Sequence, residues 1–128
     1  MRVYYEDTDA AGIVYYANYL KFIERARTEA LLAIGFRQTE LRARYGLVFA
    51  VREITVRYLA PARLEDQLVV RTASEAPRGA RLEMAQEIWR GDTLLVRARV
   101  TLACLGPDGR PLRIPADVAD ALTRLATV

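Results

Sequence analysis

The stretch VYYEDTDAAGIVYYANYLKFIERARTE, residues 3–29, places acids, small residues and tyrosines directly ahead of a helical pattern. Over residues 19–34 the apolar side chains recur at steps of three and four, which is the spacing of one helix face. Gly35 follows and predicts a left-handed end to that helix. The acids therefore fall where a short N-terminal strand, residues 1–5, gives way to a long helix. They are Glu6, Asp7 and Asp9.

The sequence beyond this helix is typical of a short helix followed by strands. Residues 39–45 favour a helix that ends at Gly46, and the patterns after it alternate through β-branched and aromatic residues. A last helical pattern begins at Pro115. The predicted strands cover residues 47–61, 66–76, 78–91 and 92–106.

Short turns join these strands, and consecutive short connections require an antiparallel sheet. Such a sheet buries one face, and the long amphipathic helix is the element available to cover it. We expect an α+β fold, a single domain over residues 1–128, in which an antiparallel five-stranded sheet, counting residues 1–5, wraps around a long central helix. Four charged residues of this helix are expected on its surface or at an interface, namely Glu24, Arg25, Arg27 and Glu29.

The composition of the 128 residues, 52% hydrophobic and 27% charged, is typical of one compact domain. The formal net charge is +3 and the basic residues are scattered, so we expect no nucleic-acid partner. Cys104 is the single cysteine, which fits a reducing compartment without disulfides. The sequence has no apolar leader and no run of about 18 apolar residues. We expect a soluble, cytoplasmic protein with no transmembrane segment.

The sequence contains no histidine. This excludes Ser-His and Cys-His nucleophile pairs, histidine-based dehydratases and zinc sites that contain histidine. Acid-base chemistry must then fall to carboxylates, tyrosines or bound water. We expect no metal and no cofactor.

The stretch at residues 3–29 resembles the signature of the hotdog-fold acyl-CoA thioesterases of the 4-hydroxybenzoyl-CoA thioesterase type. It is most similar to the bacterial branch encoded beside the Tol-Pal envelope genes. The signature fixes acids, a glycine, aromatics and an asparagine at set offsets over about a fifth of the chain, and the order of helix then strands agrees over the remainder. The resemblance implies a hotdog fold and hydrolysis of an acyl-CoA thioester to the free acid and CoA.

The resemblance assigns catalysis to Asp9, the second aspartate of an Asp-x-Asp element, as nucleophile or as general base. It also assigns the backbone N–H of Tyr16, near the start of the helix, to the thioester carbonyl oxygen. Free N–H groups and the helix dipole favour a developing oxyanion, which supports this division of roles. Many relatives of the Tol-Pal branch carry a histidine where this chain has Tyr16, so no imidazole assists here.

Four further residues are candidates for binding the substrate. Gly12 lets the loop turn sharply and lets a substrate come close. Asn18 is either a helix cap or a residue that fixes the loop. Arg78 and Arg81, in APRGARLE, match the positions where the family carries basic residues for the nucleotide, and guanidinium groups suit phosphate. The alternative for both is an ordinary solvated arginine in a hairpin.

The family also implies a homo-oligomer, a dimer or a tetramer, with the active site between subunits. The alternative function is a non-catalytic acyl-thioester binding or scaffold protein of the same fold. A peripheral link to envelope or lipid machinery is part of what the resemblance suggests. The sequence leaves the length and the aromatic or aliphatic nature of the acyl group open.

Overall fold

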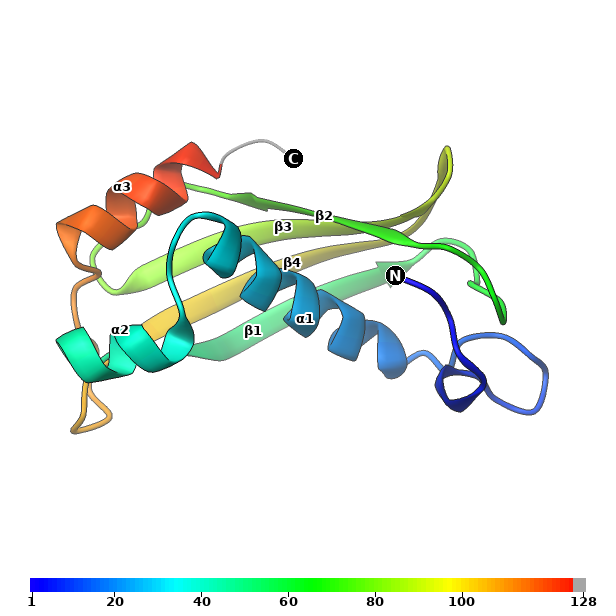
Figure 1. Ribbon diagram of the computed structural model, residues 1–128, viewed down its shortest axis with the longest axis horizontal. Helices are drawn as coiled ribbons and strands as arrows, with labels where there is room; N and C mark the ends of the chain where they lie inside the picture. Colours follow the sequence, from blue (N-terminus) through cyan, green and yellow to red (C-terminus); the bar gives the residue numbers. More distant parts are fainter. Residues whose placement is uncertain (126–128) are drawn as a thin grey trace.

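Four strands and three α-helices make up residues 1–125, the part of the chain that the computed structural model describes (Figure 1). A 3-10 turn, η1, at Tyr5–Asp7 precedes them. The helices are α1 (Asn18–Ala33), α2 (Gln38–Tyr45) and α3 (Ala116–Arg124), and the strands are β1 (Val48–Tyr58), β2 (Val69–Ser74), β3 (Arg81–Arg90) and β4 (Thr93–Leu105).

The strands form one antiparallel sheet in the order β1-β4-β3-β2, and α1 crosses one face of it (Figure 1). The two-residue connection at Gly91 and Asp92 makes the β3–β4 hairpin that the sequence predicts. Tyr58, at the end of β1, pairs with Val96 of β4, which pairs with Ile88 of β3. This register sets which residues share each end of the sheet.

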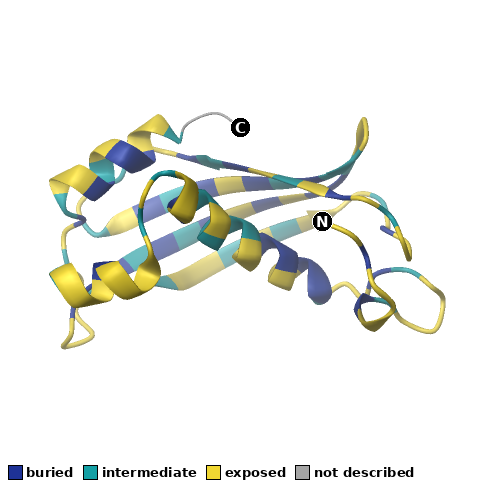
Figure 2. Cartoon of the chain, viewed as in Figure 1, coloured by how far each residue is buried: buried dark blue, intermediate teal, exposed yellow. Residues whose placement is uncertain are grey.

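The core lies between α1 and the two central strands. Along β3 and β4 buried and accessible residues alternate, as expected for strands with one covered face (Figure 2). Each large apolar side chain buried here contributes about 1.5–3 kcal/mol to folding. The residues that face α1 include Leu82, Met84, Ile88, Val96 and Val100, and α1 contributes Tyr19, Phe22, Ile23 and Leu31.

One polar side chain interrupts the apolar face of β3. Gln86 is 0% exposed, and its Nε2 donates to the Ile23 carbonyl at 3.0 Å and to Thr72 Oγ1 at 3.1 Å. Its Oε1 accepts from Arg27 Nη1 at 3.1 Å. Arg27 thus turns toward the sheet and is only partly exposed, so a fully exposed position is wrong for it, while a position at an interface stays a prediction. The amide fixes α1 over β2 and β3.

The predicted fifth strand is wrong, because residues 1–5 do not join the sheet. Val3 exchanges backbone hydrogen bonds with Asp66 and Glu65, and then the chain leaves the pairing direction. The N–H of Tyr4 donates to Asp7 Oδ2 at 3.0 Å, which closes η1 in place of a further ladder bond. What remains is an isolated bridge between Arg2 and Gln67 beside a four-stranded sheet.

The predicted helices are confirmed to within one residue at the start of each. Residues 19–34 correspond to α1, residues 39–45 to α2, and Pro115 directly precedes α3. The terminal pattern also includes residues 126–128, which lie outside the described range. None of the described helices has the length and apolarity to span a membrane.

Gly46 ends α2 at φ +67°, and a Cβ atom there would lie 2.8 Å from Cγ of Pro107. We predict that Gly46→Ala lowers the free energy of unfolding by about 2 kcal/mol or more, because a left-handed alanine adds backbone strain to the clash. Gly91→Ala is the control, since Gly91 has φ +56° and open space around its Cβ position. It should cost about 1 kcal/mol. Equal losses in urea unfolding would show that Pro107 gives way freely.

Candidate functional site

Residues 8–14 form a tight turn that presents Asp9 to solvent. The N–H of Asp9 donates to the Ile13 carbonyl at 2.9 Å, and the N–H of Gly12 donates back to the Asp9 carbonyl at 3.1 Å. Gly12 has φ +78°, so the predicted sharp turn at this glycine is confirmed. Asp9 Oδ1 accepts the Ala11 N–H at 2.8 Å, while Oδ2 has no hydrogen-bond partner among residues 1–125. One carboxylate oxygen is thus oriented and the other is available.

Asp7 joins this turn to the helix. Its side chain is only 7% exposed, and Oδ1 accepts Asn18 Nδ2 at 3.0 Å while Oδ2 accepts the Tyr4 N–H. Its carbonyl accepts the Tyr15 N–H at 3.0 Å. Asn18 therefore fixes the loop and does not cap the helix, since the N-cap position is Ala17 without a side-chain cap. Both sides of the Asp9 turn are anchored to the start of α1.

The start of α1 carries unpaired backbone donors. Asn18 N–H donates to the Tyr15 carbonyl at 2.8 Å, and Leu20 N–H donates to the Ala17 carbonyl at 3.2 Å. Within the described range, the N–H groups of Tyr16 and Ala17 donate to no protein acceptor. Free donors at the positive end of a 16-residue helix form a favourable site for negative charge.

Aromatic side chains surround this helix entrance. Tyr16 is 61% exposed, and its carbonyl accepts the Tyr58 hydroxyl at 3.2 Å. The hydroxyl of Tyr19 accepts the N–H of Ala62 at 2.9 Å, which pins the segment after β1 against α1. A hollow of about 250 Å³ results, with an apolar and aromatic wall. Its lining is Ile13, Val14, Tyr16, Tyr19, Tyr58, Leu59, Ala60 and Pro61.

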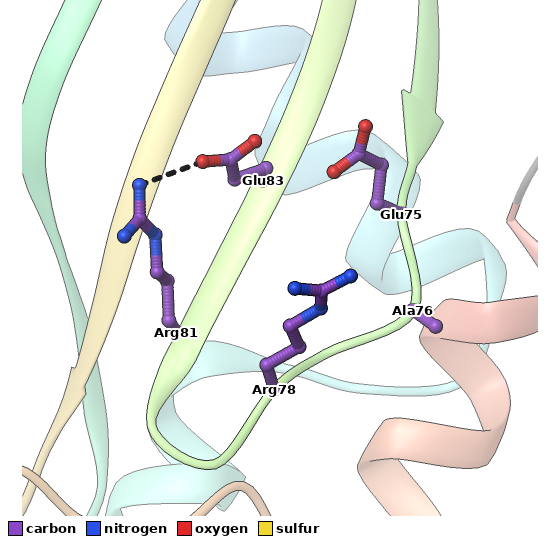
Figure 3. Close-up of a pocket in the computed structure, with 5 residues that line it drawn as sticks. All are labelled: Glu75, Ala76, Arg78, Arg81 and Glu83. Atoms are coloured by element: carbon purple, nitrogen blue, oxygen red, sulfur yellow. Dashed lines mark hydrogen bonds and ion pairs between the residues drawn. The ribbon is translucent and has the colours of Figure 1, made fainter.

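Arg78 and Arg81 line a separate hollow of about 360 Å³ in the β2–β3 connection (Figure 3). Arg81 donates to Glu83 at 2.8 Å, and Glu83 also pairs with Arg99. Hydrogen bonds from Arg99 and then Arg81 hold the pKa of Glu83 below its usual value. Arg78 forms no ion pair with any described residue. The two arginines thus differ, because only Arg78 has a guanidinium uncommitted to a carboxylate.

These arginines lie far from Asp9 in the same chain. The Asp9 turn packs at the Tyr58 end of β1, and this end is level with Ile88 of β3. Arg81 begins β3 at the opposite end, about 23 Å from Ile88 at the usual rise per residue. A single chain therefore brings Asp9, Tyr16, Gly12 and Asn18 together at one end of the sheet, and Arg78 and Arg81 at the other.

Comparison with known proteins shows the family. Residues 11–97 match the model of the Thioesterase superfamily. The chain belongs to this superfamily. It is 48% identical over 108 residues, 84% of this chain and 80% of the relative, to the acyl-CoA thioester hydrolase YbgC of Escherichia coli O157:H7. It is 40% identical to the acyl-CoA thioesterase YbgC of Haemophilus influenzae, over 98% of this chain and 93% of the relative.

A solved structure agrees with this thioesterase assignment. The probable thioesterase from Bartonella henselae superposes with a TM-score of 0.84 at 39% identity, over 90% of this chain and 95% of that one. The thioesterase family and the hotdog fold predicted from residues 3–29 are thereby confirmed, with four strands in place of five. The chain is a thioester hydrolase by family.

The sequence does not determine two features of this candidate site. The motif identifies Asp9 but not the bond between Asp7 and Asn18, since no local pattern relates residues 11 apart across a turn. Tyr58 comes from a strand 42 residues beyond Tyr16, and its aromatic character alone does not distinguish a site residue from a core residue. Both features depend on tertiary contacts.

We predict that Asp7→Ala lowers the free energy of unfolding of this thioesterase by about 2 kcal/mol, because it leaves the buried Asn18 amide and the Tyr4 N–H without an acceptor. Asp9→Ala, which removes an exposed carboxylate two residues away, should change stability by less than about 0.5 kcal/mol. Urea unfolding of the two variants measures the contrast. A larger loss for Asp9→Ala would contradict these roles.

Proposed function

We propose that this thioesterase hydrolyses an acyl-CoA thioester at the entrance of α1, with Asp9 acting at the carbonyl carbon and the Tyr16 N–H binding the carbonyl oxygen. The observation that carries the proposal is the unpaired Tyr16 N–H at the positive helix end, tied by Asp7 to the turn that carries Asp9. The curated relatives named as acyl-CoA thioester hydrolases support the substrate class.

Asp9 has two routes to the products. Its free carboxylate oxygen attacks the thioester carbon and forms a mixed anhydride that water then cleaves, or it takes a proton from a water that attacks directly. In both routes the C–S bond breaks and the sulfur leaves as thiolate. A thiol with a pKa of about 8.5 needs no strong general acid to leave. A chain without histidine is therefore competent for this reaction.

We predict that Asp9→Asn lowers turnover by about 100-fold or more while stability stays unchanged, because the amide neither attacks nor accepts a proton well. Release of free thiol from a panel of acyl-CoA thioesters measures turnover. Near-wild-type hydrolysis by Asp9→Asn would refute the role of Asp9. Binding of the panel by the unmutated chain without any turnover would favour the scaffold function.

A homodimer through β1 would bring the separated residues together. β1 is 11 residues long and, among the described strands, pairs only with β4. Its helix-facing residues Val51 and Tyr58 remain 48% and 45% exposed. A long unprotected edge of this kind is a template for pairing with another chain. Antiparallel pairing of two β1 strands about a two-fold axis sets the Tyr58 end of one chain beside the Val48 end of the other.

In that arrangement, Arg78 of the partner subunit lies at the same end of the joined sheet as Asp9. We propose that the active site forms between the two subunits and that Arg78 supplies the cation for the CoA phosphates. Arg81, already paired with Glu83, contributes less. A tetramer built from two such dimers is compatible with the same site.

We predict that Arg78→Ala raises KM for acyl-CoA several-fold and leaves kcat unchanged, because a phosphate contact remote from the reacting carbon acts on binding. An acyl-pantetheine thioester, which lacks the nucleotide, serves as the control substrate and should show no change. Steady-state kinetics with both substrates measures the difference. An unchanged KM for acyl-CoA would remove Arg78 from the site.

Mixing Asp9→Asn chains with Arg78→Ala chains tests where the two residues meet. A mixed dimer rebuilds one intact site only if Asp9 works with Arg78 of the partner subunit, and random mixing then restores about a quarter of wild-type activity at low substrate. No gain above the separate variants would place both residues in one chain.

We further propose a cytoplasmic location. The single thiol, Cys104, is buried in β4, and burial raises its pKa, so it stays a protonated thiol suited to a reducing compartment. The link to envelope or lipid machinery remains a prediction from the sequence resemblance.

A further inference from the structure

A third hollow, of about 260 Å³, lies between the C-terminal half of α1 and the sheet. Apolar side chains from α1, β1, β3 and β4 make most of its wall, namely Leu31, Phe49, Val51, Leu82, Met84 and Leu102. Two charged residues of α1, Glu24 and Arg27, also line it. Thr28 and Gln38 complete the lining, so the hollow has a mixed wall, with apolar side chains from the sheet and a cation from α1.

Arg27 is held in this wall by a fixed acceptor. Its Nη1 donates to Oε1 of Gln86 at 3.1 Å, and Gln86 is itself anchored by Ile23 and Thr72. Burial lowers the pKa of Arg27, and the nearby charge of Glu24 partly offsets this effect. A guanidinium nevertheless remains charged at neutral pH. The Gln86 contact thus holds the positive charge in the wall of the hollow.

No carboxylate of the described chain forms an ion pair with Arg27, although Glu24 lines the same hollow. Glu24 is exposed and belongs to the preceding turn of α1, and it lies beyond the 4.0 Å of an ion pair. Four of the five N–H donors of Arg27 have no protein acceptor within residues 1–125. A partly desolvated cation without a counter-ion is costly, and a ligand that carries a carboxylate would remove that cost.

The hollow is within reach of the reacting carbon in the dimer proposed above. Antiparallel pairing of the β1 strands sets Tyr58 of one chain next to the Val48 end of the other, and Phe49 and Val51 from that end line the hollow. An acyl chain that starts between Asp9 and Tyr16 thus crosses the seam between the strands and continues into the hollow of the partner. The apolar wall suits its methylene groups.

We propose that this hollow receives the acyl chain and that Arg27 binds a carboxylate at its far end, so that the preferred substrates are CoA thioesters of dicarboxylic acids. This inference rests on the acyl-CoA hydrolysis proposed above. Arg27 then determines specificity for the end of the acyl chain that is remote from the thioester, and the chemistry at Asp9 is unchanged.

Matched pairs of substrates test the inference. Succinyl-, adipoyl- and suberoyl-CoA are compared with butyryl-, hexanoyl- and octanoyl-CoA, so that each pair differs only in the terminal carboxylate. The wild-type chain should favour the dicarboxylic member at the length that reaches Arg27. Arg27→Met, which keeps an unbranched flexible side chain but is shorter and removes the charge, should lower the ratio of kcat/KM for the dicarboxylic member to kcat/KM for its monocarboxylic partner by about tenfold or more. Arg27→Lys should retain part of the preference.

Arg25→Met is the matched control, because Arg25 loses the same charge from the same helix but lines a different hollow with Val70 and Thr72. For Arg25→Met, the ratio of kcat/KM between the two members of each substrate pair should equal that of the wild type. Thermal unfolding of the three variants identifies any loss of fold, and the ratio within one variant is independent of the amount of active enzyme. An unchanged ratio in Arg27→Met would overturn the inference.

Binding measurements separate this inference from the proposed function. Calorimetric titration of the Asp9→Asn chain with adipoyl-CoA and hexanoyl-CoA gives a ratio of dissociation constants that needs no turnover. The ratio of the hexanoyl-CoA dissociation constant to the adipoyl-CoA dissociation constant should fall toward one when Arg27→Met is added. A ratio that is insensitive to Arg27 overturns the carboxylate site even when hydrolysis is confirmed. Absence of hydrolysis in the wild type overturns the proposed function, while the binding ratio still tests the hollow.

Discussion

The contact between the Asp7 carboxylate and the Asn18 amide is the constraint on which the candidate active site depends. It satisfies a buried charge, closes η1 through the Tyr4 N–H and fixes the loop at the first residue of α1. Asp9, two residues further, is thereby left at the surface with a free oxygen. The two aspartates of one short motif thus have opposite environments. Asp7 is buried with both oxygens hydrogen-bonded, whereas Asp9 is exposed.

The sequence predicts those parts of the structure that depend on local patterns. The periodicity of residues 19–34 and the turn at Gly91 yield α1 and the β3–β4 hairpin to within a residue. The prediction fails where a side chain competes with the backbone, as when Asp7 takes the Tyr4 N–H and ends the first strand. It fails again at Arg27, because the acceptor that turns this side chain inward lies 59 residues away. Motif resemblance locates Asp9, but only the register of the sheet reveals how far Arg78 is from it.

The position of α1 connects the core to the open edge of the sheet. Gln86 ties α1 to β2 and β3, so the helix is centred on one half of the sheet. β1 at the other edge keeps its helix-facing side chains partly exposed, although they are apolar and aromatic. The same buried amide holds Arg27, which lines the hollow between α1 and β1.

The unpaired edge of β1 has a consequence for folding and aggregation. A single subunit exposes a row of free backbone donors and acceptors over 11 residues, with Val48 and Val51 partly exposed along it. An edge of this kind pairs readily with other exposed edges, so partly folded copies at high concentration are prone to aggregate. In the dimer proposed above the same edge would be covered, and the measured stability would then rise with protein concentration.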